Sequence, residues 1–180
     1  MIVIAIAAIV LALAAPNFNE TIKNNRLTNK VNDIVVALGI ARQTAIARGV
    51  TTMVCHSNDT ETNGPSCAGG TASNWSTGNI IYTVPINTIV TAQRDYNAST
   101  DTIIQQSKLN DNDNIVVTDI GGNAGNYISF ASSGLLFGST APITLQVCDD
   151  RTGEDGTIIR VSSAGRVTTQ DATAGGNACA

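Results

Sequence analysis

The fold of this chain is decided by its first fifty residues, which read MIVIAIAAIVLALAAPNFNETIKNNRLTNKVNDIVVALGIARQTAIARGV, residues 1–50. The opening run, Met1–Ala15, contains no polar side chain. As a helix this run would reach roughly 22 Å, short of the roughly 30 Å hydrocarbon core of a bilayer. Three interpretations compete: the core of a signal peptide, a buried core helix, and a membrane segment whose first turn or two precedes Met1. We favour the third, because the helical pattern does not stop at Ala15.

Downstream of Pro16 the apolar residues form a narrow stripe with a period of 3.5 residues, as on one face of a helix. After Phe18 and Ile22, its members are Leu27, Val31, Ile34, Leu38, Ala41 and Ala45. We expect this second half to dock on the chain's own globular part. The cations of the segment lie mostly off the stripe: Lys23, Arg26, Lys30 and Arg42.

The end of the helix and its weakest part can also be predicted. Gly49 directly after Arg48 is typical of a helix C-cap with a cation in the last turn. Pro16 and the neighbouring asparagines predict a helix that is continuous but soft between Ala14 and Asn25. A helix from Met1 to Arg48 would measure roughly 70 Å, too long for a domain of this size to cover. Its front must therefore be buried in a membrane or among other copies of the chain.

From Val50 onward, short β-branched runs alternate with turn residues, which predicts antiparallel strands in a small sandwich or two packed sheets. Residues 85–101 are ambiguous between loop, strand and helix. The candidate strands are Val50–Cys55, Asn79–Val84, Ile103–Lys108, Ile115–Thr118, Tyr127–Ala131, Ile143–Cys148, Thr157–Ser162 and Arg166–Thr169.

Four cysteines, Cys55, Cys67, Cys148 and Cys179, leave three possible disulfide pairings. Pairing of sequence neighbours would close one loop in each half and hold the C-terminus. Zinc is the rival interpretation, but no close pair of cysteines has the spacing of zinc ligands. We therefore expect disulfides, and with them an oxidising compartment.

Composition argues for a structural protein rather than an enzyme. The 180 residues are only 13% charged, and the net charge of −4 divides into +3 over residues 1–50 and −7 over residues 51–180. The acidic globular part does not suit a protein that coats nucleic acid through its overall field. A single histidine, His56, leaves no Ser/His/Asp set. We expect no catalytic residue, no metal and no cofactor.

The N-terminal segment resembles the first helix of type IV pilins and type II secretion pseudopilins, most closely those of the FimT/GspH minor pilin group. In that family a Gly-Phe-Thr-Leu-Ile-Glu-Leu stretch stands just before the position of Met1 and is cut after its glycine by prepilin peptidase. The resemblance rests first on the hydrophobic run with Ala14–Phe18 and on Ala41–Val50, which includes Ala47-Arg48-Gly49. It continues more loosely through Cys55, Cys67, Trp75, Gly78–Tyr82, Phe130–Gly134, Cys148, Ser163–Val167 and Cys179.

The resemblance implies an α+β, pilin-like fold, with a long N-terminal helix packed on an antiparallel β-domain of two small sheets. Residues 1–49 would be the pilin helix and residues 50–180 the β-domain. The chain would wait in the inner membrane and then polymerise, with its own copies or with other pilins, into an extracellular pilus or a periplasmic pseudopilus. The filament core would be formed by Ile2, Ile4, Ile6, Ile9, Leu11, Leu13, Pro16 and Phe18.

Two other functions stay open. Members of the FimT branch are linked to DNA uptake through a Gly-Arg-x-Arg element, which resembles Gly165-Arg166-Val167-Thr168 without its second arginine. Arg166 and Arg160 are therefore the only DNA-binding candidates, and we expect Arg166 to be a solvated strand residue. The other alternative is a secreted β-sandwich whose signal peptide is removed near Pro16.

Smaller motifs have plain interpretations. Acidic runs at Asp111–Asp113, Asp149-Asp150 and Glu154-Asp155 offer oxygens to calcium but match no EF-hand spacing, so solvated turns are expected. His56 is expected on the surface, and Trp75 in the core. The Asn-x-Ser/Thr triplets at Asn58, Asn74 and Asn97 are glycosylation-type sequons, which a chain rich in Asn and Thr produces readily by chance.

Overall fold

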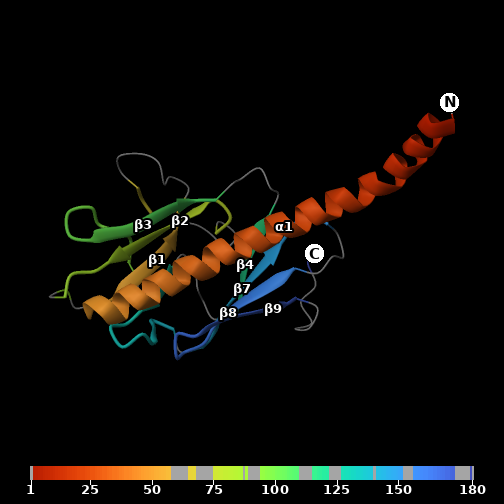
Figure 1. Cartoon of the computed structure of the whole chain (residues 1–180). Helices are drawn as coiled ribbons and strands as arrows, with labels where there is room; N and C mark the ends of the chain where they lie inside the picture. Colours follow the sequence, from red (N-terminus) through yellow and green to blue (C-terminus); the bar gives the residue numbers. More distant parts are fainter. Residues whose placement is uncertain are drawn as a thin grey trace.

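The computed structural model in Figure 1 consists, over the residues it describes, of one long helix followed by nine strands. It describes residues 2–57, 65–67, 75–86, 88, 94–109, 115–121, 127–139, 141–151, 156–172 and 179, with the backbone alone for 4–18 and 119–121. The C-terminal half of the helix lies across the sheets, and the N-terminal part extends beyond them.

Helix α1 runs without interruption from Ile2 to Arg48, 47 residues. It continues through Pro16, as expected for a continuous rod. It ends as predicted, because Gly49 adopts a left-handed conformation with φ of 65°. The N–H of Val50 then donates to the carbonyl oxygen of Ala45 at 3.2 Å, which is the bond that closes a Schellman cap.

The strands form two antiparallel sheets. The first sheet has the order β3-β2-β1-β5-β6, and the second has the order β4-β7-β8-β9. The strands of the first are β1 (Thr52–His56), β2 (Gly78–Thr83), β3 (Thr102–Lys108), β5 (Tyr127–Phe130) and β6 (Leu136–Phe137). The strands of the second are β4 (Val116–Gly121), β7 (Ile143–Cys148), β8 (Thr157–Val161) and β9 (Val167–Asp171).

One hydrophobic core joins the helix to both sheets. All six members of the predicted stripe, from Leu27 to Ala45, are buried, so the docking expected for the second half of the helix is confirmed. They pack with Val54 and Ile128 of the first sheet and with Leu145 and Ile159 of the second. Each valine, leucine or isoleucine side chain of this set, fully buried, contributes about 1.5–3 kcal/mol relative to exposure to water. The docked half of α1 is therefore part of the globular core.

A second, smaller cluster lies on the opposite face of the first sheet. Because side chains alternate across a strand, Met53 and Cys55 of β1 point away from the face that carries Val54. They pack with Ile80, Tyr82 and Val84, and Tyr96 lies against the same cluster. As a result β1 and β2 are buried on both faces.

The strand predictions were accurate in position and wrong in some details. The two-residue strand β6 was missed, because Leu136–Phe137 is too short to show a pattern. Strand β4 runs to Gly121, beyond the predicted end at Thr118. The ambiguous residues 85–101 form no strand or helix at their described positions, which are 85, 86, 88 and 94–101.

Candidate functional site

The N-terminal part of α1 is the first candidate site, because it projects from the globule as a single helix (Figure 1). Ile2 and Val3 at its tip are 77% and 78% exposed. The side chains of Ile4, Ile6, Ile9, Leu11, Leu13, Pro16 and Phe18 lie outside the described residues, although their backbone is helical. Among the described residues, no helix combines the length and the apolarity needed to cross a membrane.

A buried lysine attaches the helix on one side of the apolar stripe. Lys30 is only 4% exposed, although the sequence placed it off the stripe. Its Nζ donates to the carbonyl oxygen of Ser76 in the turn before β2. The same turn holds both sheets, since the hydroxyl of Ser76 accepts from the N–H of Val117 at 3.2 Å and the hydroxyl of Thr77 donates to the carbonyl of Ser57 at 2.9 Å.

Arg42 attaches the helix on the other side of the stripe, twelve residues further along. Its Nε donates to the carbonyl oxygen of Gly134 at 3.0 Å, and its Nη2 donates to that of Ala164 at 3.1 Å. Gly134 lies in the turn between β5 and β6, and Ala164 in the turn between β8 and β9. One guanidinium group thus ties the helix to a turn of each sheet, a role that the geometry of its fork suits.

The two turns held by Arg42 approach each other closely at Gly165. This residue has a φ of 72°, and a Cβ there would lie 2.0 Å from the carbonyl oxygen of Gly134. Only glycine fits such a contact without displacing the backbone. The N–H of Leu136 also donates to the carbonyl oxygen of Ser163 at 3.0 Å, which joins the two sheets directly.

The acidic turn after β7 is occupied by the chain's own cations. Lys23 forms an ion pair with Asp150 at 2.9 Å, and Arg151 donates to Asp149 through Nε at 2.8 Å. Partial burial raises the pKa of Asp149, but the hydrogen bonds and charge of Arg151 outweigh it and hold the pKa below its ordinary value. The hydrogen bond from Lys23 likewise lowers the pKa of Asp150.

No group of three His, Cys, Asp or Glu side chains is arranged to hold a metal ion within the part of the chain that the structure describes. Asp149 and Asp150 of the second acidic run are engaged by cations. The other acidic runs, Asp111–Asp113 and Glu154-Asp155, for which solvated turns were expected, lie outside the described residues.

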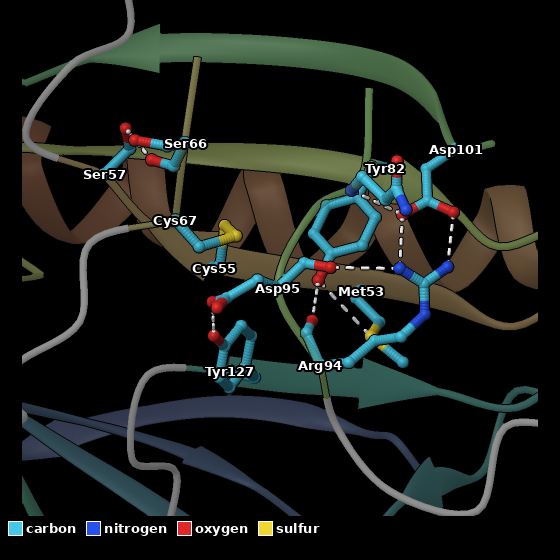
Figure 2. The surroundings of a disulfide bond; sticks show 11 residues. Met53, Cys55, Ser57, Ser66, Cys67, Tyr82, Arg94, Asp95, Asp101 and Tyr127 are labelled. Atoms are coloured by element: carbon cyan, nitrogen blue, oxygen red, sulfur yellow. Dashed lines mark hydrogen bonds and ion pairs between the residues drawn. A yellow bond between two sulfur atoms is a disulfide. The ribbon is translucent and has the colours of Figure 1, made fainter. Parts of the chain in front are cut away.

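Two disulfides join the four cysteines as sequence neighbours. Cys55 of β1 bonds to Cys67, with 5.6 Å between the Cα atoms. Cys148 at the end of β7 bonds to Cys179, with 5.7 Å between the Cα atoms. The first bond lies beside the second apolar cluster (Figure 2). The second holds the C-terminal end of the chain against the second sheet.

The two arginines considered for DNA binding are both exposed. Arg160 lies on β8 opposite Thr168 of β9, and Arg166 lies in the turn between these strands. Neither side chain forms a hydrogen bond or ion pair with the other described residues. Both side chains are accessible to a ligand, but they contribute only two positive charges to residues 51–180, whose net charge is −7.

The expectation for His56 was wrong, whereas that for Trp75 was correct. His56 is fully buried at the end of β1. Its ring centroid lies 6.0 Å from that of Trp75, which is also buried. A surface position was expected because histidine is a polar residue. His56 is buried instead because it ends a strand that is covered on both faces.

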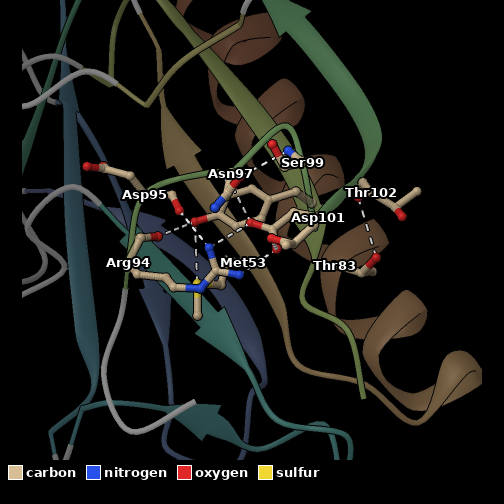
Figure 3. Close-up of polar contacts among 10 residues, drawn as sticks. Met53, Thr83, Arg94, Asp95, Asn97, Ser99, Asp101 and Thr102 are labelled. Carbon is tan, nitrogen blue, oxygen red and sulfur yellow. Dashed lines mark hydrogen bonds and ion pairs between the residues drawn. The ribbon is translucent and has the colours of Figure 1, made fainter. Parts of the chain in front are cut away.

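Residues 94–101 form a polar network that the sequence did not reveal. Asp101 has a fully buried side chain and accepts two hydrogen bonds from the guanidinium of Arg94. Tyr127 of β5 donates its hydroxyl to Asp95, and Tyr82 of β2 donates to the backbone carbonyl of Arg94. Figures 2 and 3 show how these contacts fix the segment over the second apolar cluster.

The two tyrosines of this network resist ionisation. Burial raises the pKa of Tyr82 well above its ordinary value, and the neighbouring Tyr127 adds to this effect. Burial also raises the pKa of Tyr127, together with its hydrogen bond to Asp95 and the charge of that carboxylate. Both hydroxyls therefore stay protonated at neutral pH and donate the hydrogen bonds that hold segment 94–101 in place.

Comparison with known proteins identifies what this arrangement is similar to. The profile of a family described as "Type II transport protein GspH" matches residues 30–165. Two crystal structures of the type IV minor pilin FimU from Pseudomonas aeruginosa (strain PAO1) resemble the fold. The first has a TM-score of 0.59 at 15% identity, covering 87% of this chain and 94% of FimU. The second has a TM-score of 0.55 at 14% identity, covering 84% and 96%. None of the curated proteins matches significantly.

Proposed function

The chain belongs to the type II transport protein GspH family, whose members are pilin-like structural subunits and not enzymes, and from this premise we propose that it polymerises into a filament through the projecting part of α1. The filament is a type IV pilus or a type II secretion pseudopilus, and the partners are copies of this chain or other pilins. Before assembly the projecting part lies in the inner membrane. Afterwards the chain lies in an extracellular or periplasmic filament.

The observation that carries this proposal is the division of α1 into two halves with different surroundings. The stripe from Leu27 to Ala45 is buried against the chain's own sheets. The tip of the other half is exposed at Ile2 and Val3, and the sequence around it, Met1–Ala15, has no polar side chain. An apolar surface of this kind must be covered by lipid or protein. A single projecting helix can pack against the corresponding helices of several other subunits.

The physical step in assembly is an exchange of lipid contacts for protein contacts. Because lipid tails are as apolar as leucine side chains, the association of helices within the membrane depends on close packing rather than on the hydrophobic effect. The small residues among the larger apolar ones of the projecting part, such as Ala5, Ala7 and Ala8, allow helices to approach closely. The globular part then forms the outside of the filament.

Incorporation into filaments tests the proposal directly. Cells that make the full chain with an epitope tag are sheared, and the filaments are examined by immunogold electron microscopy. We expect label on wild-type filaments and a loss of at least tenfold for Leu13→Lys, because an unpaired charge buried among packed helices costs more than about 1.4 kcal/mol, the free energy that corresponds to tenfold.

The matched control is Asn24→Lys, which adds the same charge at an exposed position of the polar section of α1. Asn24→Lys should leave the label unchanged, and both variants should keep their two disulfides, as measured by thiol labelling. Incorporation of Leu13→Lys at the wild-type level would contradict the proposal. So would the absence of the wild-type chain from every filament.

The alternative function, DNA capture by a minor pilin, is supported only by the exposure of Arg160 and Arg166. Each phosphate contact contributes to the salt dependence of binding, so two arginines predict a shallow slope of about −2 on double-stranded DNA. A mobility-shift assay of the full chain at rising salt, repeated with Arg160→Ala and Arg166→Ala, distinguishes the functions. We expect no shift at physiological salt. Binding there that both substitutions abolish would favour the alternative.

A further inference from the structure

Segment 94–101 presents one of the four Asn-x-Ser/Thr triplets of the chain to solvent. Asn97, Ala98, Ser99 and Thr100 are all exposed, whereas Asp101 directly after them is buried. The triplet Asn97-Ala98-Ser99 has the acceptor pattern for N-linked glycans, which requires a surface loop in an exported protein. Of the other acceptor asparagines, Asn58 and Asn74 lie outside the described residues, and Asn19 lies within helix α1 rather than in a loop.

The carboxamide of Asn97 is held with its nitrogen available. Its Oδ1 accepts from the N–H of Ser99 at 2.9 Å, so the side chain and the serine of the triplet are joined in one turn (Figure 3). The N–H of Asn97 donates to Asp101 at 2.9 Å, and its carbonyl accepts from the N–H of Asp101 at 2.8 Å. Within the described residues, Nδ2 of Asn97 has no hydrogen-bond partner.

Asp95 distinguishes this triplet from the other three. It stands two residues before Asn97 and is exposed, whereas Asn17, His56 and Ala72 hold the corresponding positions before Asn19, Asn58 and Asn74. A carboxylate at this position offers an ion-pair partner to a cationic side chain of a transferase. Its hydrogen bond from Tyr127 fixes where that charge is presented.

The position of the segment leaves room for a bulky group. It covers Met53 and Tyr82, on the face of the first sheet opposite to the face that carries Val54 and packs against α1. A glycan on Asn97 therefore points away from the helix and does not obstruct contacts made through it. The exposed side chains of residues 97–100 are also not needed for packing beneath the segment.

We propose that Asn97 is an N-glycosylation site, modified by an oligosaccharide transferred from a polyprenyl-pyrophosphate donor outside the cytoplasm. Nδ2 attacks the anomeric carbon of the donor sugar, and a C–N bond forms. The bond from that carbon to the pyrophosphate oxygen breaks, and its electron pair leaves with the polyprenyl pyrophosphate. The amide loses one proton to a base of the transferase, and nothing is oxidised or reduced.

Peptide mass spectrometry tests this site on the full chain in two settings. The first is protein isolated from the organism that makes it. The second is protein made in a bacterial periplasm together with a single-subunit oligosaccharyltransferase and its lipid-linked oligosaccharide. We expect the peptide that contains Asn97 to carry the added glycan mass in both, and the peptides with Asn19, Asn58 and Asn74 to be unmodified.

Three variants separate acceptor chemistry from folding. Asn97→Asp keeps an oxygen for the N–H of Ser99 but removes Nδ2, and Ser99→Ala removes the hydroxyl; both should reduce modification more than tenfold. Ser99→Thr keeps the hydroxyl and should retain modification. An unmodified Asn97 peptide in either setting, or modification at Asn19, Asn58 or Asn74 instead, would overturn the proposal. Because the readout is glycan mass, it is independent of whether the chain enters filaments.

Discussion

Replacement of Arg42 by alanine should lower the free energy of unfolding by about 2–3 kcal/mol. A hydrogen bond to a charged group contributes about 1.5–3 kcal/mol, and the partly buried bond from Nε to Gly134, at 3.0 Å, falls in this range. The exposed bond from Nη2 to Ala164, at 3.1 Å, is screened by water and adds less than about 1 kcal/mol. The loss also leaves a buried carbonyl of Gly134 without its donor.

Thermal unfolding of the full chain in detergent micelles measures this loss. The single tryptophan, Trp75, is buried in the core, so its fluorescence reports the collapse of packing between α1 and the sheets. For a domain of this size, 2–3 kcal/mol corresponds to a decrease in Tm of about 5–10 °C. Arg42→Lys keeps one donor and should lose about half as much.

The matched control is Gln43→Ala, one residue along the helix at an exposed position. It should change the stability by less than about 0.5 kcal/mol, as is usual for surface positions. If Arg42→Ala unfolds at the same temperature as Gln43→Ala, the two bonds contribute nothing. The account of how the helix is tied to both sheets would then be wrong.

Three further predictions concern covalent and polar links. Replacing both Cys148 and Cys179 by alanine should cost about 4 kcal/mol in denaturant unfolding, because their bond closes a loop with a separation of 31 residues; an unchanged midpoint would contradict this. Asp101→Asn should cost about 2–3 kcal/mol, less than the 3–5 kcal/mol typical of a broken buried pair, since the side chain of Arg94 is 31% exposed. Because the pKa values of Tyr82 and Tyr127 are raised above 10.0 in the folded state, the protonated hydroxyls contribute stability below pH 10.0, and this contribution is lost as the pH rises further. The phenolate absorbance of these two tyrosines should therefore appear together with unfolding, and their ionisation in the folded protein would refute this.

The parts of the fold that could be predicted are those with a local cause. The stripe from Leu27 to Ala45 follows from helical periodicity, and the helix end follows from the glycine at position 49. The strands follow from β-branched runs between turn residues. In each case the signal lies within a few residues of the feature that it predicts.

The parts that were missed depend on partners far along the chain. Lys30 can be buried because the carbonyl oxygen of Ser76, 46 residues away, accepts a hydrogen bond from its ammonium group. Arg42 finds its acceptors 92 and 122 residues away. Backbone carbonyls exist at every residue, so no residue type marks them as partners. The conformation of segment 94–101 was missed for the same reason, because it depends on hydrogen bonds from tyrosines of two other strands.

The division of one unbroken helix between a free half and a docked half also determines how the molecule bears load. A pull on the projecting end is transmitted along the helix axis and therefore runs parallel to the surface where the docked half meets the sheets. The buried side chains and the two flanking cations then resist together in shear, whereas a pull perpendicular to that surface would detach them one after another. Tension along a rod of this kind is thus shared over the whole length of the attachment, from Leu27 to Ala45.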